Sequence, residues 1–358
     1  MVKKLKKQTK SFKTVFDKLL KILKTEKGLL YHKSSKNNNK QGIAVTIDEL
    51  LAVRLNGKNI LNKPTKKVGT YGSGAYRSPF RGRGMEFDEV RIYQEGDDIR
   101  CIDWRITAKT GQAHTKVFHE ERERMVLVLT DLRPQMRFAT RTAFKSVIAS
   151  KISAIIGWSA LENHDRIGGL VLSASKAVMI KAHRSRKRLM GLFNAIVEGS
   201  LDSNAKSTAS LSKSLAEIKK NAISGSLVFV ISDFSDYNED VEKQLLYLKA
   251  HCDVVCIKVY DILEKEPPPY GVYRISDGKN IALMRADDEN WRQAYVKLFS
   301  DKEQKIRLFC NKYRISFITI RTDDDLAAEL YSSLYTQKRN SVSIVSSGHY
   351  DNRLKASL

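Results

Sequence analysis

A short, unbroken apolar stretch near the middle of the chain constrains its fold more than any other feature. Met125 to Met136 reads Met-Val-Leu-Val-Leu-Thr-Asp-Leu-Arg-Pro-Gln-Met, so the hydrophobic run stops at Asp131 and a proline-containing turn follows. A continuous apolar run is typical of a central strand in a parallel sheet, because both of its faces are covered. Ligands of open α/β sheets bind just beyond the carboxyl ends of such strands. We therefore expect Asp131 to lie at a functional edge.

Strands and helices alternate from this run to about residue 337. A second apolar run, Ser226 to Ser232, also ends in an acid, Asp233. Further strands are expected at residues 166–172, 254–259 and 316–320, with helices between them and a hairpin around Asp277-Gly278 at the sheet edge. This alternation predicts an α/β fold, a doubly wound and mostly parallel sheet with helices on both faces. Asp131 and Asp233 should then face each other across one carboxyl-edge crevice.

The chain is predicted to have four parts. Residues 1–70 form a basic amino-terminal extension with short helices, residues 71–124 a small β-rich segment, residues 125–337 the α/β domain and residues 338–358 a polar, disordered tail. In the extension, Thr46 and Glu49 match a capping box. Thr322 and Asp325 are expected to cap the last helix of the α/β domain. Apolar residues from Phe12 to Leu23 recur at helical spacing between lysines, which predicts a basic amphipathic helix. It either docks on the protein itself or lies on an anionic membrane surface.

Basic residues are in large excess, giving a formal net charge of +23. Such a charge favours acidic partners, whether nucleic acid, an anionic membrane or an acidic protein surface. Arginine, glycine and aromatic residues interleave from Tyr71 to Arg83, a composition that suits single-stranded nucleic acid. The same residues are explained by a glycine-rich loop leading into a strand, and they lack the order of a P-loop.

The expected location is the cytoplasm, with a peripheral position at the inner face of the membrane as an alternative. Four scattered cysteines and no recognisable secretory signal favour reduced thiols. No stretch of the sequence reaches the 18 or so consecutive apolar residues that a membrane span needs.

Paired opposite charges fill residues 84–124, between apolar positions that predict short strands with turns at Glu95-Gly96 and Thr110-Gly111. Three pieces of this segment, Arg-Gly-Met-Glu-Phe, Gly-Asp-Asp-Ile-Arg and Ile-Asp-Trp-Arg, resemble the signature of the domain of unknown function 58 family. The matching signature residues are Glu86, Asp97, Asp98, Arg100, Asp103, Trp104 and Arg105. The resemblance implies a von Willebrand factor A-like domain after the small segment. It also implies action with a MoxR-type AAA+ ATPase in the assembly or maturation of other proteins.

The resemblance further implies a divalent-cation site, built in von Willebrand A domains from Asp-x-Ser-x-Ser, a threonine and a second aspartate. Asp131 and Asp233 match the two aspartates, but Arg133 and Gln135 stand where the serines would be. Arginine cannot coordinate a cation, and its permanent charge repels one. We therefore expect a degenerate site without magnesium or another cofactor. In it Arg133 pairs with Asp131 or Asp233, the alternative being that Arg133 points to solvent.

These observations favour a non-enzymatic protein-interaction module. Its expected partner-binding residues are Asp131, Arg133, Gln135, Asp233 and Ser235, and its expected partner is a MoxR-type AAA+ ATPase or that ATPase's client. The alternative is a nucleic-acid-binding protein that uses the basic amino-terminal arm and the loop from Tyr71 to Arg83. A hydrolase is disfavoured, because no nucleophile, metal set or phosphate loop accompanies the two acids.

Overall fold

The computed structural model describes residues 42–57, 61, 85–120, 123–202, 209–276 and 281–334. The chain divides into two compact units, one made of residues 1–62 and 124–358 and the other of residues 63–123. We call them the α/β unit and the small unit. The predictions for residues 12–23, 71–83 and 338–358 lie outside the described residues, and the four-part division of the chain stays a prediction.

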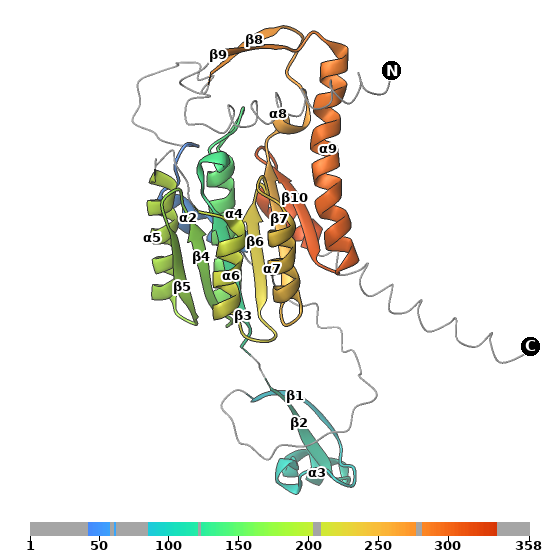
Figure 1. The fold of residues 1–358 in the computed structure, drawn as a ribbon. Coiled ribbons are helices and arrows are strands. Elements are labelled where there is room, and N and C mark those ends of the chain that lie inside the picture. The colour runs from blue at the N-terminus through green and yellow to red at the C-terminus, as the bar shows by residue number, and fades with distance from the viewer. Residues whose placement is uncertain are drawn as a thin grey trace, which may run out of the picture. The chain divides into compact units, whose positions relative to one another are not determined.

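A six-stranded sheet forms the centre of the α/β unit (Figure 1). Its strands, in spatial order, are β10 (Ser316–Arg321), β7 (Asp253–Tyr260), β6 (Leu227–Ser232), β3 (Met125–Asp131), β4 (Arg166–Leu172) and β5 (Ala177–His183). Neighbouring strands are parallel except for β4 and β5. Every residue of β3 is buried, as expected for a central strand with two covered faces. The predicted doubly wound, mostly parallel sheet is confirmed.

Helices cover both faces of this sheet (Figure 1). One face packs against α2 (Ile47–Ala52), α4 (Lys145–Glu162), α5 (Arg186–Leu201) and the helix of residues 326–334. The other packs against α6 (Leu211–Asn221), α7 (Glu239–Lys249) and α9 (Glu289–Lys312). The capping box of Thr46 and Glu49 is confirmed at the start of α2. Trp158 of α4 donates to the Leu50 carbonyl (3.0 Å), which fixes α2 on the α/β unit.

Three details of this unit differ from the sequence prediction. Strand β5 was not expected, because it is a short edge strand with mostly exposed or half-buried positions. The predicted hairpin exists as β8 (Val272–Ser276) and β9 (Ile281–Arg285), but it forms its own two-stranded sheet and is not part of the main sheet edge. Thr322 was expected to cap the last helix, yet its hydroxyl donates to Asp261 (2.8 Å) and Asp325 alone accepts from the helix amides.

The small unit pairs β1 (Met85–Ile92) with β2 (His114–Glu120) in antiparallel register. The connection between them is helical: η2 (Ile99–Cys101), then α3 (Trp104–Thr110). The strand expected around Trp104 is therefore wrong. Asp103 accepts from the amides of Arg105 (3.0 Å) and Ile106 (3.2 Å), and Gly111 ends the helix at φ +73°. An aspartate cap and a left-handed glycine are the ordinary signals for a helix start and stop.

Every helix among the described residues is too short or too polar to cross a membrane. All four cysteines are free thiols, and Cys252, Cys256 and Cys310 are buried. Cys252 and Cys256 therefore behave as small apolar residues of the core.

Candidate functional site: the carboxyl edge of the sheet

The site is built where β3 and β6 end next to each other. Thr130 lies opposite Ile231 in the parallel register, so Asp131 reaches the level of Ser232. The Ser232 hydroxyl donates to Asp131 Oδ2 (2.7 Å). Beyond β6 the backbone turns sharply at Phe234, which has φ +53° and is buried. A bulky residue seldom adopts this conformation. The turn lies between Asp233, which pairs with Lys145, and Asp236, which pairs with Arg133.

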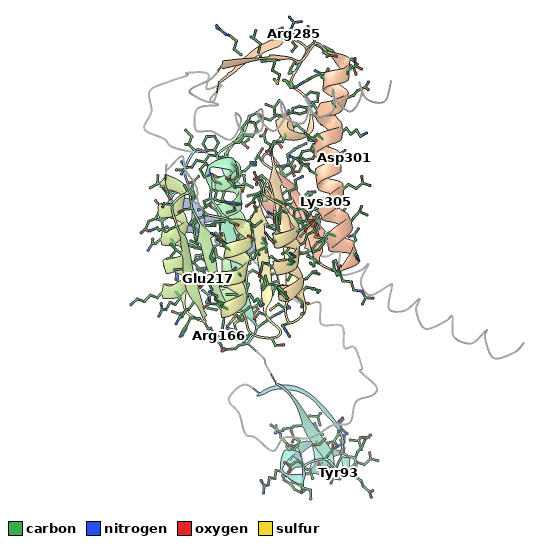
Figure 2. The ribbon with its side chains drawn as sticks, in the orientation of Figure 1. Tyr93, Arg166, Glu217, Arg285, Asp301 and Lys305 are labelled. Carbon is green, nitrogen blue, oxygen red and sulfur yellow. The ribbon has the colours of Figure 1, made fainter. Side chains whose placement is uncertain are left out.

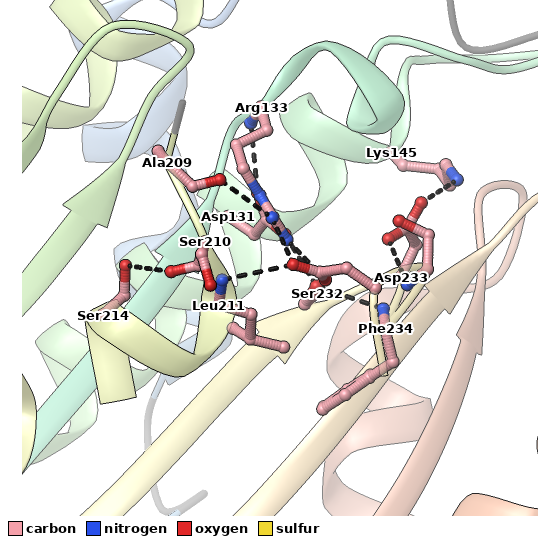
Figure 3. Close-up of polar contacts among 12 residues, drawn as sticks. Asp131, Arg133, Lys145, Ala209, Ser210, Leu211, Ser214, Ser232, Asp233 and Phe234 are labelled. Carbon is pink, nitrogen blue, oxygen red and sulfur yellow. Dashed lines mark hydrogen bonds and ion pairs between the residues drawn. The ribbon is translucent and has the colours of Figure 1, made fainter. Parts of the chain in front are cut away.

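Arg133 lies between two carboxylates (Figure 3). Its Nε and Nη2 donate to Asp131 Oδ1 (2.9 Å) and Oδ2 (2.7 Å). Its Nη1 and Nη2 donate to Asp236 Oδ2 (2.6 Å) and Oδ1 (3.0 Å). Asp131 is fully buried and Arg133 is 3% exposed. The planar guanidinium thus meets both carboxylates in two-point contacts, the geometry that arginine favours. We name Asp131, Arg133 and Asp236 the arginine trio.

Neighbouring groups complete this arrangement. With its amide oxygen turned toward the guanidinium, Gln135 accepts from Arg133 Nη2 (3.0 Å) and Nε (2.9 Å). Burial opposes the charged form of Arg133, but the charges of Asp131 and Asp236 and their hydrogen bonds raise its pKa. Burial also opposes ionisation of Asp236, yet the hydrogen bonds and charge of Arg133 lower the pKa of that carboxyl. Arg133 and Asp236 are therefore both charged at neutral pH.

A second buried cation lies nearby on the same edge. Lys145, the first residue of α4, donates through Nζ to Asp233 Oδ2 (3.0 Å) and to Glu264 Oε1 (2.8 Å). Glu264 belongs to α8 (Ile262–Lys265), which follows β7. Burial opposes the charged form of Lys145, but the two carboxylates raise its pKa. We name Asp233, Lys145 and Glu264 the lysine trio.

Asp261 joins these loops to one another, since it is fully buried and accepts from three segments. Its carboxylate accepts hydrogen bonds from the amide (3.0 Å) and the hydroxyl (2.7 Å) of Thr140. It also accepts from the hydroxyl of Thr322 (2.8 Å) and from the amide of Leu263 (3.0 Å). These contacts tie the loop before α4 to the ends of β7 and β10. The edge is consequently a rigid support for whatever binds there.

This donor set does not fit magnesium, which needs about six hard oxygen ligands in octahedral array. Both Asp131 oxygens already accept, from Arg133 on one side and from Ser232 and Arg133 on the other. Asp233 accepts from Lys145 and from the amide of Ser235 (2.9 Å). A cation at either carboxylate would lie against a guanidinium or an ammonium group. Among the described residues, no group of three or more His, Cys, Asp or Glu is placed to hold a metal ion.

The five residues expected to bind a partner all lie at this edge, but the structure distributes them between two clusters. Arg133 meets Asp131, one of the two carboxylates considered for it, and does not point to solvent. Its second carboxylate is Asp236, because Asp233 turns to Lys145. Ser235 is half-buried beside Asp233. Their role in partner binding stays a prediction.

The signature residues of the small unit have mainly local contacts. Asp97 accepts from Arg91 (2.7 Å) and from the amide of Gln94 (3.1 Å), while Asp98 and Asp103 cap η2 and α3. Lys116 lies 3.3 Å from Asp103. The paired charges of the small unit therefore form a few short-range contacts and helix caps. Trp104, Arg100 and Arg105 are exposed, and the backbone of Glu86 pairs with β2.

Sequence reasoning missed Ser232, Asp236, Lys145, Glu264 and Asp261. A signal existed for Lys145, since a cation in the first turn of a helix is disfavoured by the helix dipole and calls for nearby carboxylates. Asp236 is visible in Ser-Asp-Phe-Ser-Asp as a second acid three residues after Asp233. Glu264 is marked locally as the N3 residue of a capping box that begins at Asp261, but its contact with Lys145 depends on the path of β7 and α8.

Comparison with known proteins places this geometry in context. Uncharacterized proteins of Mycobacterium bovis (Mb1516) and Mycobacterium tuberculosis (Rv1480) are each 21% identical over 262 residues, covering 73% of this chain and 82% of the relative. A von Willebrand factor type A structure from Catenulispora acidiphila is similar at 9% identity and a TM-score of 0.31, covering 63% of this chain and 44% of that chain. The α/β unit has the doubly wound, mostly parallel sheet that the sequence predicts.

A second similar structure is described as an aerotolerance-related membrane protein from Bacteroides fragilis. It shares 13% identity and a TM-score of 0.33, and the match covers 62% of this chain and 99% of that chain. This description contradicts the cytoplasmic location expected from the sequence, and that location is therefore withdrawn.

The family signature found in the small unit agrees with a match over most of the chain. The family described as Protein of unknown function DUF58 matches residues 89–305, from within β1 to within α9. The match thus includes residues 89–123 of the small unit and all members of the arginine and lysine trios. This chain belongs to the DUF58 family.

Proposed function

We propose that the chain is a non-enzymatic protein-interaction module that binds its partner at the carboxyl edge without a metal ion. The observation that carries the proposal is the buried guanidinium of Arg133 between Asp131 and Asp236. It supplies positive charge where a von Willebrand A domain would hold a cation. The edge then binds through its shape and its fixed loops, and not by ligation of a partner carboxylate to a metal.

The arrangement also argues against catalysis at this edge. A general base needs a free lone pair within reach of substrate. The carboxylates of Asp131 and Asp233 are instead buried and hydrogen-bonded to basic side chains. Both acids therefore lack the exposure that proton transfer to a substrate needs.

The partner we propose is a MoxR-type AAA+ ATPase, or a client protein that such an ATPase remodels. Support comes from the family resemblance, and from an edge whose loops are tied together by Asp261 into a stable binding surface. Standard interfaces of about 800 Å² per partner need such a preorganised surface for useful affinity.

Binding of the purified full-length chain to the MoxR-type ATPase of the same organism tests this function. Interferometry would compare the wild type with Ser235→Arg, which places a long cation at the half-buried edge. It would also include Ile223→Arg, which changes an exposed residue before the amino end of β6. We expect Ser235→Arg to weaken binding at least tenfold and Ile223→Arg to leave it unchanged.

The same titration is repeated with EDTA. Unchanged affinity is the expected result, since the arginine and lysine trios need no cation. Loss of binding in EDTA, or equal binding by Ser235→Arg and the wild type, would contradict the proposal.

A further inference from the structure

The β8–β9 hairpin presents a patterned outer face. In its antiparallel register Val272 lies opposite Arg285, and Arg274 lies opposite Leu283. Directly opposed residues share a face of a sheet, and so do residues two apart on one strand. Val272, Arg274, Leu283 and Arg285 therefore tile one surface, which we call the hairpin face. Val272 is 56% exposed and Leu283 is 68% exposed, and both arginines are exposed.

The base of the hairpin is fixed to α9. The Ala286 amide donates to the Gly271 carbonyl (2.8 Å), and Arg292 donates to the carbonyls of Pro268 (2.6 Å) and Ala286 (3.1 Å). The Arg292 guanidinium also lies over the Tyr270 ring, 4.2 Å from its centroid. The hairpin face is thus held in place, and Figure 2 shows Arg285 on the far side of the hairpin from the sheet.

The hairpin is linked to the carboxyl edge by short, bonded connections. It follows α8, whose Glu264 is a member of the lysine trio, and the Tyr295 hydroxyl of α9 donates to the Leu263 carbonyl. Chain order is β7, α8, hairpin, α9, so the hairpin is an insertion at the end of the sheet where the two trios lie (Figure 1). The hairpin therefore lies at the same end of the α/β unit as a partner bound at the carboxyl edge.

The charges of the hairpin face differ from those of the edge. Arg133 and Lys145, the basic members of the two trios, each already bind two carboxylates. Neither Arg274 nor Arg285 has an ion pair with any residue in the described part of the chain. Arginine is enriched at protein–protein interfaces and among the residues that contribute most to binding. Both outer edges of this two-stranded sheet also lack a strand partner among the described residues.

We propose that the hairpin face binds an acidic, extended segment of the partner protein that engages the carboxyl edge. Carboxylates of such a segment meet Arg274 and Arg285. Aliphatic side chains on the same face of the segment, two residues away from the carboxylates, cover Val272 and Leu283. An extended chain repeats its side chains on one face every two residues, which matches the two-residue spacing of the hairpin face. The inference rests on the proposed function in one respect, namely that the segment belongs to the same partner.

A labelled peptide of about ten residues serves as the probe, and its anisotropy is measured with the full-length chain. Every second residue of the peptide is in turn glutamate or valine, with serine at the positions between, so both kinds of side chain lie on one face of the extended chain. A second peptide has lysine in place of glutamate. The main variant is Arg274→Glu with Arg285→Glu. The matched control is Lys187→Glu with Arg188→Glu, which makes the same charge change at exposed positions of α5. A third variant, Val272→Ser with Leu283→Ser, removes the aliphatic contacts.

We expect the arginine variant to weaken binding of the glutamate peptide at least tenfold and the serine variant several-fold. The α5 control should change it less than twofold, and the lysine peptide should not bind. Equal loss in the α5 control would overturn the inference, because binding would then follow net charge alone. It would also be overturned if the arginine variant lost binding to anionic vesicles, or lost self-association, while retaining the peptide.

The MoxR-type ATPase separates this inference from the proposed function. If the ATPase binds and is sensitive to Ser235→Arg but not to the arginine variant, the hairpin inference fails and the proposed function stands. If the ATPase does not bind but the peptide results are as expected, the proposed function fails and the hairpin face remains an acidic-segment site.

Discussion

At the carboxyl edge, Asp131 meets a guanidinium under complete burial, and the same guanidinium reaches Asp236 more than a hundred residues further along the chain. In the small unit, Asp97 and Asp103 meet groups that lie close in sequence or are partly exposed. The residue types are alike in the two regions, but their environments differ. Buried pairs are expensive to break, whereas solvent screens exposed ones. We therefore expect the buried charges of the carboxyl edge to contribute more to the free energy of unfolding than the partly exposed charges of the small unit.

The largest effect is expected for Arg133→Met. The substitution leaves Asp131 buried and without its cation, which costs about 3–5 kcal/mol in the free energy of unfolding. Urea denaturation measures the loss in the free energy of unfolding, and hydrogen exchange of peptides from β3 and β6 shows where the structure opens. Arg188→Met, at an exposed position of α5, is the matched control and should change stability little. A loss for Arg133→Met as small as that of the control would show that the edge is not held by buried charge.

A smaller effect is expected for Asp236→Asn, because the side chain of Asp236 is 34% exposed and solvent compensates part of the loss. We expect about 1–2 kcal/mol at neutral pH. The pKa of Asp236 is lowered on folding, so its stabilisation is present above the unfolded value of 3.8 and disappears as the pH falls through the lower folded value. Urea titrations from neutral pH downward should show wild type and variant converging in that acidic window. A gap that stayed constant through it would contradict the assigned cause.

In the small unit, Asp97→Ala is expected to cost about 1 kcal/mol. The ion pair with Arg91, which is 36% exposed, is weakened by solvent, and the hydrogen bond from the Gln94 amide is lost in full. Faster hydrogen exchange should be confined to residues 85–120. Acceleration that extended into β3 would show that the two regions are energetically coupled, against the contrast drawn between them.

Lys258 is a third buried basic residue, and it differs from Arg133 and Lys145, which each bind two carboxylates. Lys258 of β7 has one ion-pair partner, Glu303 (3.5 Å), and burial lowers its pKa despite that carboxylate. The unfolded chain then binds the proton more tightly, so stability should rise with pH between the lowered value and 10.5. Lys258→Met should be neutral or stabilising by up to about 1 kcal/mol at neutral pH. Destabilisation by several kcal/mol would contradict this account.

Sequence patterns predicted the α/β fold because strands buried on both faces, such as β3 and β6, have continuous apolar sequences. They predicted β5 and α3 poorly, since an edge strand is half exposed and a short helix depends on its caps. At the site, the missing serines pointed to a cation supplied by Arg133. Its second carboxylate, Asp236, and the whole lysine trio depend on how the loops after β6 and β7 turn. Long-range geometry of this kind is not written in local sequence.

Calorimetric titration of the full-length chain with magnesium and manganese measures whether basic side chains have replaced the metal at the carboxyl edge. Because Arg133 and Lys145 occupy the carboxylates that a cation would need, we predict no saturable heat at micromolar metal concentrations. Micromolar binding that disappears in Asp131→Ala would contradict the claim that basic side chains replace the metal at this edge.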